Sequence, residues 1–108
     1  MASANVRADD NTVVHRPAER RYELLVGGER AGELVYRDRG DDVIALLHTE
    51  VDPKLQRRGL GSSLVAGALD DARARGLRIV PLCPFVDAYV SRHPAYGDLV
   101  VSDPARGR

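Results

Sequence analysis

The sequence is poor in several features that mark specialised classes of protein. Its 108 residues include one cysteine, no tryptophan, four tyrosines and one phenylalanine. One cysteine excludes an intramolecular disulfide, and three scattered histidines cannot complete a cysteine-rich zinc site around it, so we expect no metal. So few aromatic rings leave little surface for stacking nucleic-acid bases.

Net charge and long apolar segments are also absent. The 16 basic and 16 acidic side chains cancel, which removes the long-range field expected of a nucleic-acid-binding protein. The longest apolar runs, residues 43–47 and 64–69, fall far short of the roughly 20 residues of a membrane helix. The first residues lack the apolar segment of a secretory signal. We therefore expect a cytoplasmic monomer or homodimer with neither nucleic-acid nor membrane partners.

Length and composition favour one folded domain. A hydrophobic content of 44% with 30% charged residues is ordinary for a globular chain, and the length suits a single core. We expect the domain over residues 13–101, with flexible tails at 1–12 and 102–108, where small, polar and charged residues prevail.

Hydrophobic periodicity predicts the order of elements. Apolar or alternating segments favour strands at residues 21–26, 31–37, 42–51 and 77–82. An apolar stripe at helical spacing predicts a helix that begins at Leu60 and stops before Gly76. Pro84 favours the start of a second helix, which runs to Arg92. The pattern β-β-β-α-β-α predicts an α/β (α+β) fold with a mixed, mostly antiparallel sheet. Its parallel pair joins the third and fourth strands.

The segment that precedes the first helix is the most informative for function. Gln56, Arg57 and Arg58 are followed by Gly59-Leu60-Gly61 and Ser62. The unpaired amides of a helix's first turn attract anions, and arginine suits phosphate oxygens. The segment therefore predicts a pyrophosphate site. The alternative is a glycine-rich turn with solvated arginines.

The same six residues, Gln56 to Gly61, resemble the Q/R-x-x-G-x-G/A motif of the Gcn5-related N-acetyltransferases. The resemblance narrows to a subgroup of short acetyltransferase-like proteins through three further segments. These are His48-Thr49-Glu50-Val51, Pro81-Leu82-Cys83-Pro84-Phe85-Val86 and His93-Pro94-Ala95-Tyr96. The similarity covers about residues 13–101 and implies the minimal acyl-CoA N-acyltransferase fold.

The resemblance also implies a site for acetyl-coenzyme A, with no metal. Amides of the loop from Gln56 to Ser62 would hold the pyrophosphate, and the pantetheine arm would run between two splayed parallel strands that end at Val51 and Leu82. The backbone N–H near Val51 would polarise the thioester carbonyl, as an oxyanion hole does. Full-size relatives carry extra helices after their first strand, and here a Gly27-Gly28 hairpin stands instead. The acceptor site should accordingly be shallow and open.

Four side chains are candidates for catalysis. Cys83 would lie near the coenzyme A sulfur, as a nucleophile that carries the acetyl group or as an inert pocket thiol. His48 and Glu50 project from one face of a strand, and either could deprotonate an amine. They could equally be a histidine bonded within the sheet and an exposed strand-end carboxylate. Tyr89 could protonate the departing thiolate, or pack in the core with Phe85. The asparagine that often opens this helix in relatives is absent, which weakens an inherited role for Tyr89.

Together these residues predict an enzyme that moves acetyl from acetyl-coenzyme A to an unidentified amine. The main alternative is a non-catalytic module that binds coenzyme A or acyl-coenzyme A. A thiol-based redox protein that uses Cys83 is a weaker alternative because the chain has no resolving cysteine. A plain interaction domain, whose glycine loop binds no anion, is the fourth interpretation.

Overall fold

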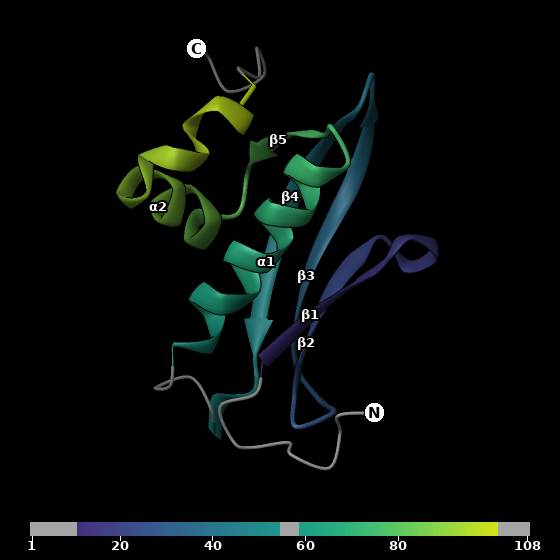
Figure 1. The fold of residues 1–108 in the computed structure, drawn as a ribbon, viewed down its shortest axis with the longest axis vertical. Helices are drawn as coiled ribbons and strands as arrows, with labels where there is room; N and C mark the ends of the chain where they lie inside the picture. Colours follow the sequence, from purple (N-terminus) through teal and green to yellow (C-terminus); the bar gives the residue numbers. More distant parts are fainter. Residues whose placement is uncertain (1–10, 55–58, 102–108) are drawn as a thin grey trace.

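The computed structural model describes residues 11–54 and 59–101. One five-stranded sheet, in the order β1-β2-β3-β4-β5, is covered by two helices (Figure 1). The elements are β1 (Asn11–Arg16), β2 (Arg21–Val26), β3 (Glu29–Gly40), β4 (Val43–Val51), α1 (Leu60–Ala74), β5 (Arg78–Pro81) and α2 (Pro84–Arg92). Strands β1 to β4 are antiparallel neighbours, and β5 runs parallel to β4. The predicted α+β class with a mixed, mostly antiparallel sheet is confirmed.

Strand β1 is an addition to the expected order, which becomes β-β-β-β-α-β-α. It pairs with β2 from Asn11 opposite Val26 to Arg16 opposite Arg21. Only two of its six residues are apolar, Val13 and Val14, so hydrophobic alternation did not reveal it. Its pairing with β2, and the contact of Val13 with α1, hold this polar segment in the sheet.

Two tight turns join the long strands. Gly27 and Gly28 have φ of 61° and 87°, as the sequence led us to expect for the hairpin between β2 and β3. The turn between β3 and β4 places Asp41 and Asp42 at φ of 56° and 62°, a conformation that aspartate tolerates better than most residues. Because this second turn is so short, β3 extends to Gly40 and is longer than expected, whereas β4 starts at Val43, one residue later than expected.

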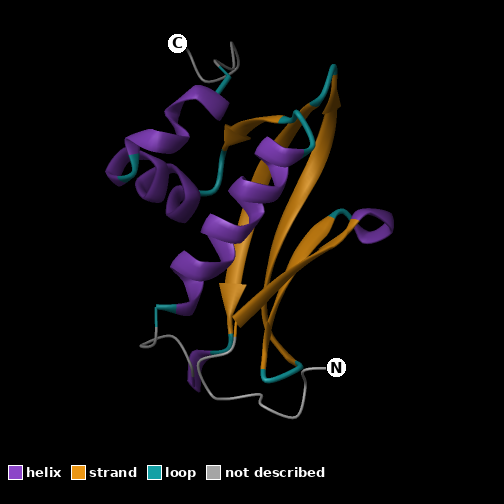
Figure 2. Cartoon of the chain, in the orientation of Figure 1, coloured by secondary structure: helices purple, strands orange, loops and turns teal. Residues whose placement is uncertain are grey.

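Helix α1 lies across one face of the sheet, and α2 lies beside the β5 edge (Figures 1 and 2). The buried residues of α1 follow the predicted stripe: Leu60, Leu64, Val65, Ala68, Leu69 and Ala72. Helix and sheet approach so closely that a Cβ at Gly67 would stand 2.4 Å from Cγ2 of Val13. Glycine at this position therefore lets β1 pack against α1. Neither helix in the described part of the chain is long and apolar enough to cross a membrane.

A polar cluster lies beneath the C-terminal half of α1. His15 Nε2 is 2.5 Å from the hydroxyl of Tyr36, and Tyr22 donates a 2.9 Å hydrogen bond to Asp71. The His15 ring stacks on Tyr22, with ring centroids 4.7 Å apart. Burial, together with the charge of Arg75, lowers the pKa of His15 below its usual value. Burial inside the fold thus disfavours the protonated form of this histidine.

A six-residue 3-10 helix, Pro94–Leu99, follows α2 and is bonded to α1 through its side chains. Tyr96 donates a 2.8 Å hydrogen bond to Asp70, and burial and this bond raise the pKa of Tyr96 to about 12. Arg73 of α1 pairs with Asp98 at 2.8 Å. Tyr96 thus has a structural role.

Strand β4 contains a β-bulge that decides which of its side chains meet the helices. Val35 lies opposite His48, whereas Tyr36 lies opposite Leu46, so Leu47 is the extra residue. Alternation restarts after the bulge. Before it, Leu46 faces the core; after it, Thr49 has taken over that face.

Candidate functional site

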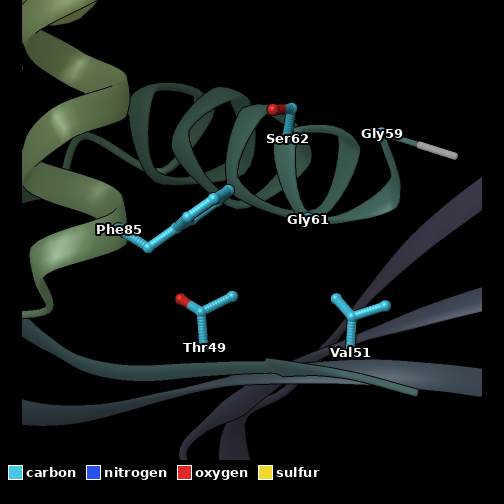
Figure 3. A pocket seen from close by; sticks show the side chains of 6 residues that line it. All are labelled: Thr49, Val51, Gly59, Gly61, Ser62 and Phe85. Atoms are coloured by element: carbon cyan, nitrogen blue, oxygen red, sulfur yellow. The ribbon is translucent and has the colours of Figure 1, made fainter. Parts of the chain in front are cut away.

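A pocket of about 410 Å³ opens where the end of β4, the start of α1 and the start of α2 converge. Its lining residues are Thr49, Val51, Gly59, Gly61, Ser62 and Phe85. Figure 3 shows Thr49 and Val51 projecting from β4 toward α1, and Phe85 reaching from α2 toward Gly61. None of these six side chains is charged, so the polar groups that the described lining offers a ligand are backbone groups and two hydroxyls.

The start of α1 presents its amides at this pocket. Gly59 has φ of 71°, a left-handed conformation in which the chain turns sharply into the helix. The hydrogen bond from Ser63 N–H to the Gly59 carbonyl, at 3.2 Å, begins the helical ladder. The amides of Leu60, Gly61 and Ser62 precede this bond and are the donors that a helix leaves without intrahelical partners. No side chain caps the helix and its first turn has no acidic residue, so this end can accept an anion.

The residues predicted to hold pyrophosphate divide into two groups. Gln56, Arg57 and Arg58 lie outside the described residues. Gly59, Gly61 and Ser62 line the pocket, whereas the side chain of Leu60 is buried in the core and leaves only its backbone for binding.

Glycine at position 61 keeps the two helices close at the pocket wall. A Cβ there would lie 3.0 Å from Cζ of Phe85. The Phe85 ring is 40% exposed and therefore borders the pocket instead of packing in the core with Tyr89. No feature of the sequence separately marked Phe85 as a pocket residue.

Strand β5 pairs along its whole length, but only with the first part of β4. Their parallel register ends with Leu46 opposite Pro81. One further hydrogen bond, from Cys83 N–H to the Leu46 carbonyl at 2.8 Å, turns the chain toward α2. Strand β4 continues alone to Val51, so the two segments separate beside the pocket. We expected two parallel strands that splay apart and end at Val51 and Leu82. In the structure their pairing ends at Leu46 and Pro81, well before Val51.

Cys83 lies at the N-terminal boundary of α2, deep beside the pocket. The residue is 4% exposed, and its Sγ is 3.4 Å from Oγ1 of Thr49. Because Thr49 lines the pocket, the thiol lies behind this one hydroxyl. The sequence singled out Cys83 but not Thr49, because alternation along β4 could not reveal the bulge at Leu47.

His48 and Glu50 are brought together, as the two-residue spacing predicts. His48 Nε2 is 3.6 Å from Glu50 Oε1, and their side chains are 60% and 69% exposed. Both lie on the face of β4 opposite to Thr49 and Val51, since neighbouring strand residues point to opposite faces. They do not line the pocket beside α1, and any role in catalysis requires an acceptor that approaches from the uncovered face of the sheet.

Tyr89 is buried in the core of the described structure. Its ring stacks on His93, with centroids 3.9 Å apart, and its carbonyl oxygen lies 2.8 Å from Nδ1 of His93. It is absent from the pocket lining. Among the described residues, no group of three or more histidine, cysteine, aspartate or glutamate side chains could hold a metal ion.

Comparisons with known proteins agree with this geometry. The model of a family described as GCN5-related N-acetyl-transferase matches residues 21–99. A solved GCN5-like protein from Staphylococcus aureus is 22% identical, with a TM-score of 0.64 over 85% of this chain and 89% of that chain. A search of curated proteins finds no match.

Larger enzymes align with parts of the chain. The ribosomal-protein-S18-alanine N-acetyltransferase of Escherichia coli is 23% identical, with a TM-score of 0.49 over 70% of this chain and 44% of that one. N-acetylglutamate synthase from Neisseria gonorrhoeae, solved with coenzyme A and N-acetyl-glutamate, is 22% identical, with a TM-score of 0.49 over 62% of this chain and 18% of that one. The chain thus spans less than half the length of these two enzymes.

The family match covers most of the described chain, and the Staphylococcus aureus protein has the same fold. The resemblance that the sequence carries at its glycine motif is thereby confirmed, and it supports classing the protein as an acyltransferase. The chain belongs to the GCN5-related N-acetyl-transferase family.

Proposed function

We propose that the protein binds acetyl-coenzyme A in the pocket between β4 and the two helices and transfers the acetyl group to an amine. The observation that carries this proposal is the coincidence, in one pocket, of the unpaired amides that begin α1 and the separation of β4 from β5. The amides suit a polyanionic end of a ligand, and the separated strands leave room for an extended one.

Each end of the ligand has a matching part of the pocket. The pyrophosphate would accept hydrogen bonds from the amides of Gly61 and Ser62, where the helix dipole adds attraction. The uncharged lining fits this assignment because no carboxylate repels the phosphates. The pantetheine arm would lie along β4 toward Thr49, and the thioester carbonyl would meet the backbone near Val51.

Two routes lead from thioester to product. In the direct route, the amine attacks the thioester carbon and the coenzyme A thiolate leaves. In the other, Sγ of Cys83 attacks the carbon and coenzyme A leaves with the thiol proton; the amine then attacks the acetyl carbon, the C–S bond breaks, and the Cys83 sulfur leaves with the proton that the amine loses. The burial of Cys83 beside the pocket supports including the second route.

The uncovered face of the sheet is where the acceptor would approach. His48 and Glu50 lie there with their side chains in contact, and either can remove the proton that an attacking amine must lose. Tyr89 remains the candidate acid for the leaving thiolate, reached only if the core around it shifts. The exposure of His48 and Glu50 favours an open acceptor site, consistent with a large or protein-borne amine.

Calorimetric titration with acetyl-coenzyme A tests the proposal. Wild type should bind with micromolar affinity, and the double variant Gly59→Glu/Gly61→Glu should lose binding because two carboxylates occupy and repel the phosphate position. Circular dichroism must show that the variant is folded. Absence of binding to folded wild type would contradict the proposal.

Turnover separates the enzyme from a binding module. Release of coenzyme A is followed with a panel of amines, with Cys83→Ala beside wild type. Acetyl transfer that survives in Cys83→Ala would select the direct route. Binding without transfer to any amine would favour the non-catalytic module.

A further inference from the structure

The contact between Thr49 and Cys83 joins a pocket residue to a buried nucleophilic atom. Thr49 Oγ1 and Cys83 Sγ are 3.4 Å apart, within hydrogen-bonding distance for sulfur, and either atom can donate. The two residues are 34 positions apart in the chain, so the contact depends on the fold and not on local sequence. The bulge at Leu47 turns the Thr49 side chain toward Cys83 instead of toward the opposite face.

We propose that Thr49 is a positioning residue, whose hydroxyl holds Cys83 Sγ at the edge of the pocket and donates a hydrogen bond to the sulfur when it is deprotonated. This inference deepens the proposed function, because it explains how a thiol behind the pocket wall could meet a thioester inside it. Threonine suits the role since its branched Cβ restricts rotation of the hydroxyl. A hydrogen bond to a charged acceptor is also stronger than one between neutral groups.

Among the described groups near Cys83 Sγ, Thr49 is the one placed to form this hydrogen bond. From β4, His48 and Glu50 flank Thr49 in sequence but lie on the opposite face of the strand. From α2, Asp87 donates its backbone N–H to the Cys83 carbonyl at 2.9 Å. The Thr49 hydroxyl is the side-chain group that the described structure places within hydrogen-bonding distance of Sγ.

Alkylation of Cys83 by iodoacetamide measures this interaction without any coenzyme. Cys83 is the sole cysteine of the chain, so one adduct by mass spectrometry reports one site, and Cys83→Ala supplies the blank. Rates are measured from pH 6 to pH 10 for wild type, Thr49→Val and Thr49→Ser. Valine keeps the shape of threonine without the hydroxyl, whereas serine keeps the hydroxyl.

We expect the curves of alkylation rate against pH for wild type and Thr49→Val to cross. Thr49→Val should shift the midpoint of the pH–rate curve upward by about one unit. Because a more basic thiolate is also more nucleophilic, the variant should react about threefold more slowly near pH 7 and about threefold faster on the high-pH plateau. Thr49→Ser should follow wild type. Thermal unfolding confirms that both variants are folded.

Two results would overturn the inference. A Thr49→Val curve that coincides with wild type would show that the hydroxyl only fills space. A uniform change at every pH, with the midpoint unmoved, would show that Thr49 controls access alone.

Titration of the same proteins with coenzyme A separates this inference from the proposed function. Crossing curves without coenzyme binding would support the action of Thr49 on the sulfur while the proposed function failed. Binding with coincident curves would overturn the role of Thr49 alone.

Discussion

Replacing Gly61 with alanine should weaken coenzyme A binding while leaving the fold almost as stable as before. The new methyl group would stand 3.0 Å from Cζ of Phe85, whereas carbon atoms prefer about 3.5–4.0 Å. The ring must therefore retreat by roughly half an ångström. Since Phe85 is 40% exposed, it can move outward into the pocket region.

The two effects on stability oppose each other. Alanine is favoured over glycine in a helix by up to about 1 kcal/mol, and the displacement of Phe85 offsets part of this gain. We expect the free energy of unfolding to change by less than about 1 kcal/mol. Binding should suffer more, because the methyl group crowds an amide placed to meet a phosphate. The loss of one charge-assisted hydrogen bond corresponds to a roughly 10- to 100-fold higher Kd.

Calorimetry with coenzyme A and urea unfolding measure the two quantities on the same protein. Gly97→Ala is the matched control, since a Cβ at Gly97 would meet nothing within 4 Å and the residue lies outside the pocket lining. Wild-type affinity in a folded Gly61→Ala variant would refute the assignment of the phosphate position to the start of α1.

Two further predictions concern the packing and the titration of the fold. Gly67→Ala should destabilise the protein by about 1–3 kcal/mol, because its Cβ would overlap both Cγ2 and Cβ of Val13; in a Val13→Gly background, which removes both atoms, the same change should stabilise, by up to about 1 kcal/mol. Chemical unfolding of the four proteins in this cycle checks the change of sign, and additive effects would refute the close contact. The lowered pKa of His15 means that the unfolded chain binds its proton more readily, so the stabilising contribution is full above about pH 6.5 and is lost as the pH falls below it. Unfolding measured from pH 4 to pH 8 should show a shallower slope for His15→Gln than for wild type. Equal slopes for His15→Gln and wild type would contradict the burial argument.

Local sequence signals were sufficient for the helices. The apolar stripe from Leu60 to Ala72 and the stop at Gly76 fix α1, because burial of one helical face depends on spacing alone. Pro84 and His93-Pro94 bound α2 for equally local reasons. The same local reasoning predicts an anion site at the amides of Gly59 and Gly61.

The arrangement of the site depends on pairing between distant residues, and that could not be predicted. The segment Leu46-Leu47-His48 contains no sequence signal for a bulge. Leu47 becomes the extra residue only through the pairing of β4 with Val35 and Tyr36 of β3. Without the bulge, His48 would share the core face with Leu46, and Thr49 would face away. The polar strand β1 was missed for a related reason, because its place depends on β2 and on Gly67 rather than on its own pattern.

We propose that coenzyme A occupies the pocket where β4, α1 and α2 converge. Titration of the nitrogen-15-labelled protein with coenzyme A, followed by amide NMR spectra, tests it residue by residue. We predict the largest chemical-shift changes at Thr49, Val51, Gly59 and Gly61. The chemical shifts of amides in β1, such as that of Val14, should not change. Shifts confined to residues outside the pocket, or none at millimolar coenzyme A, would contradict it.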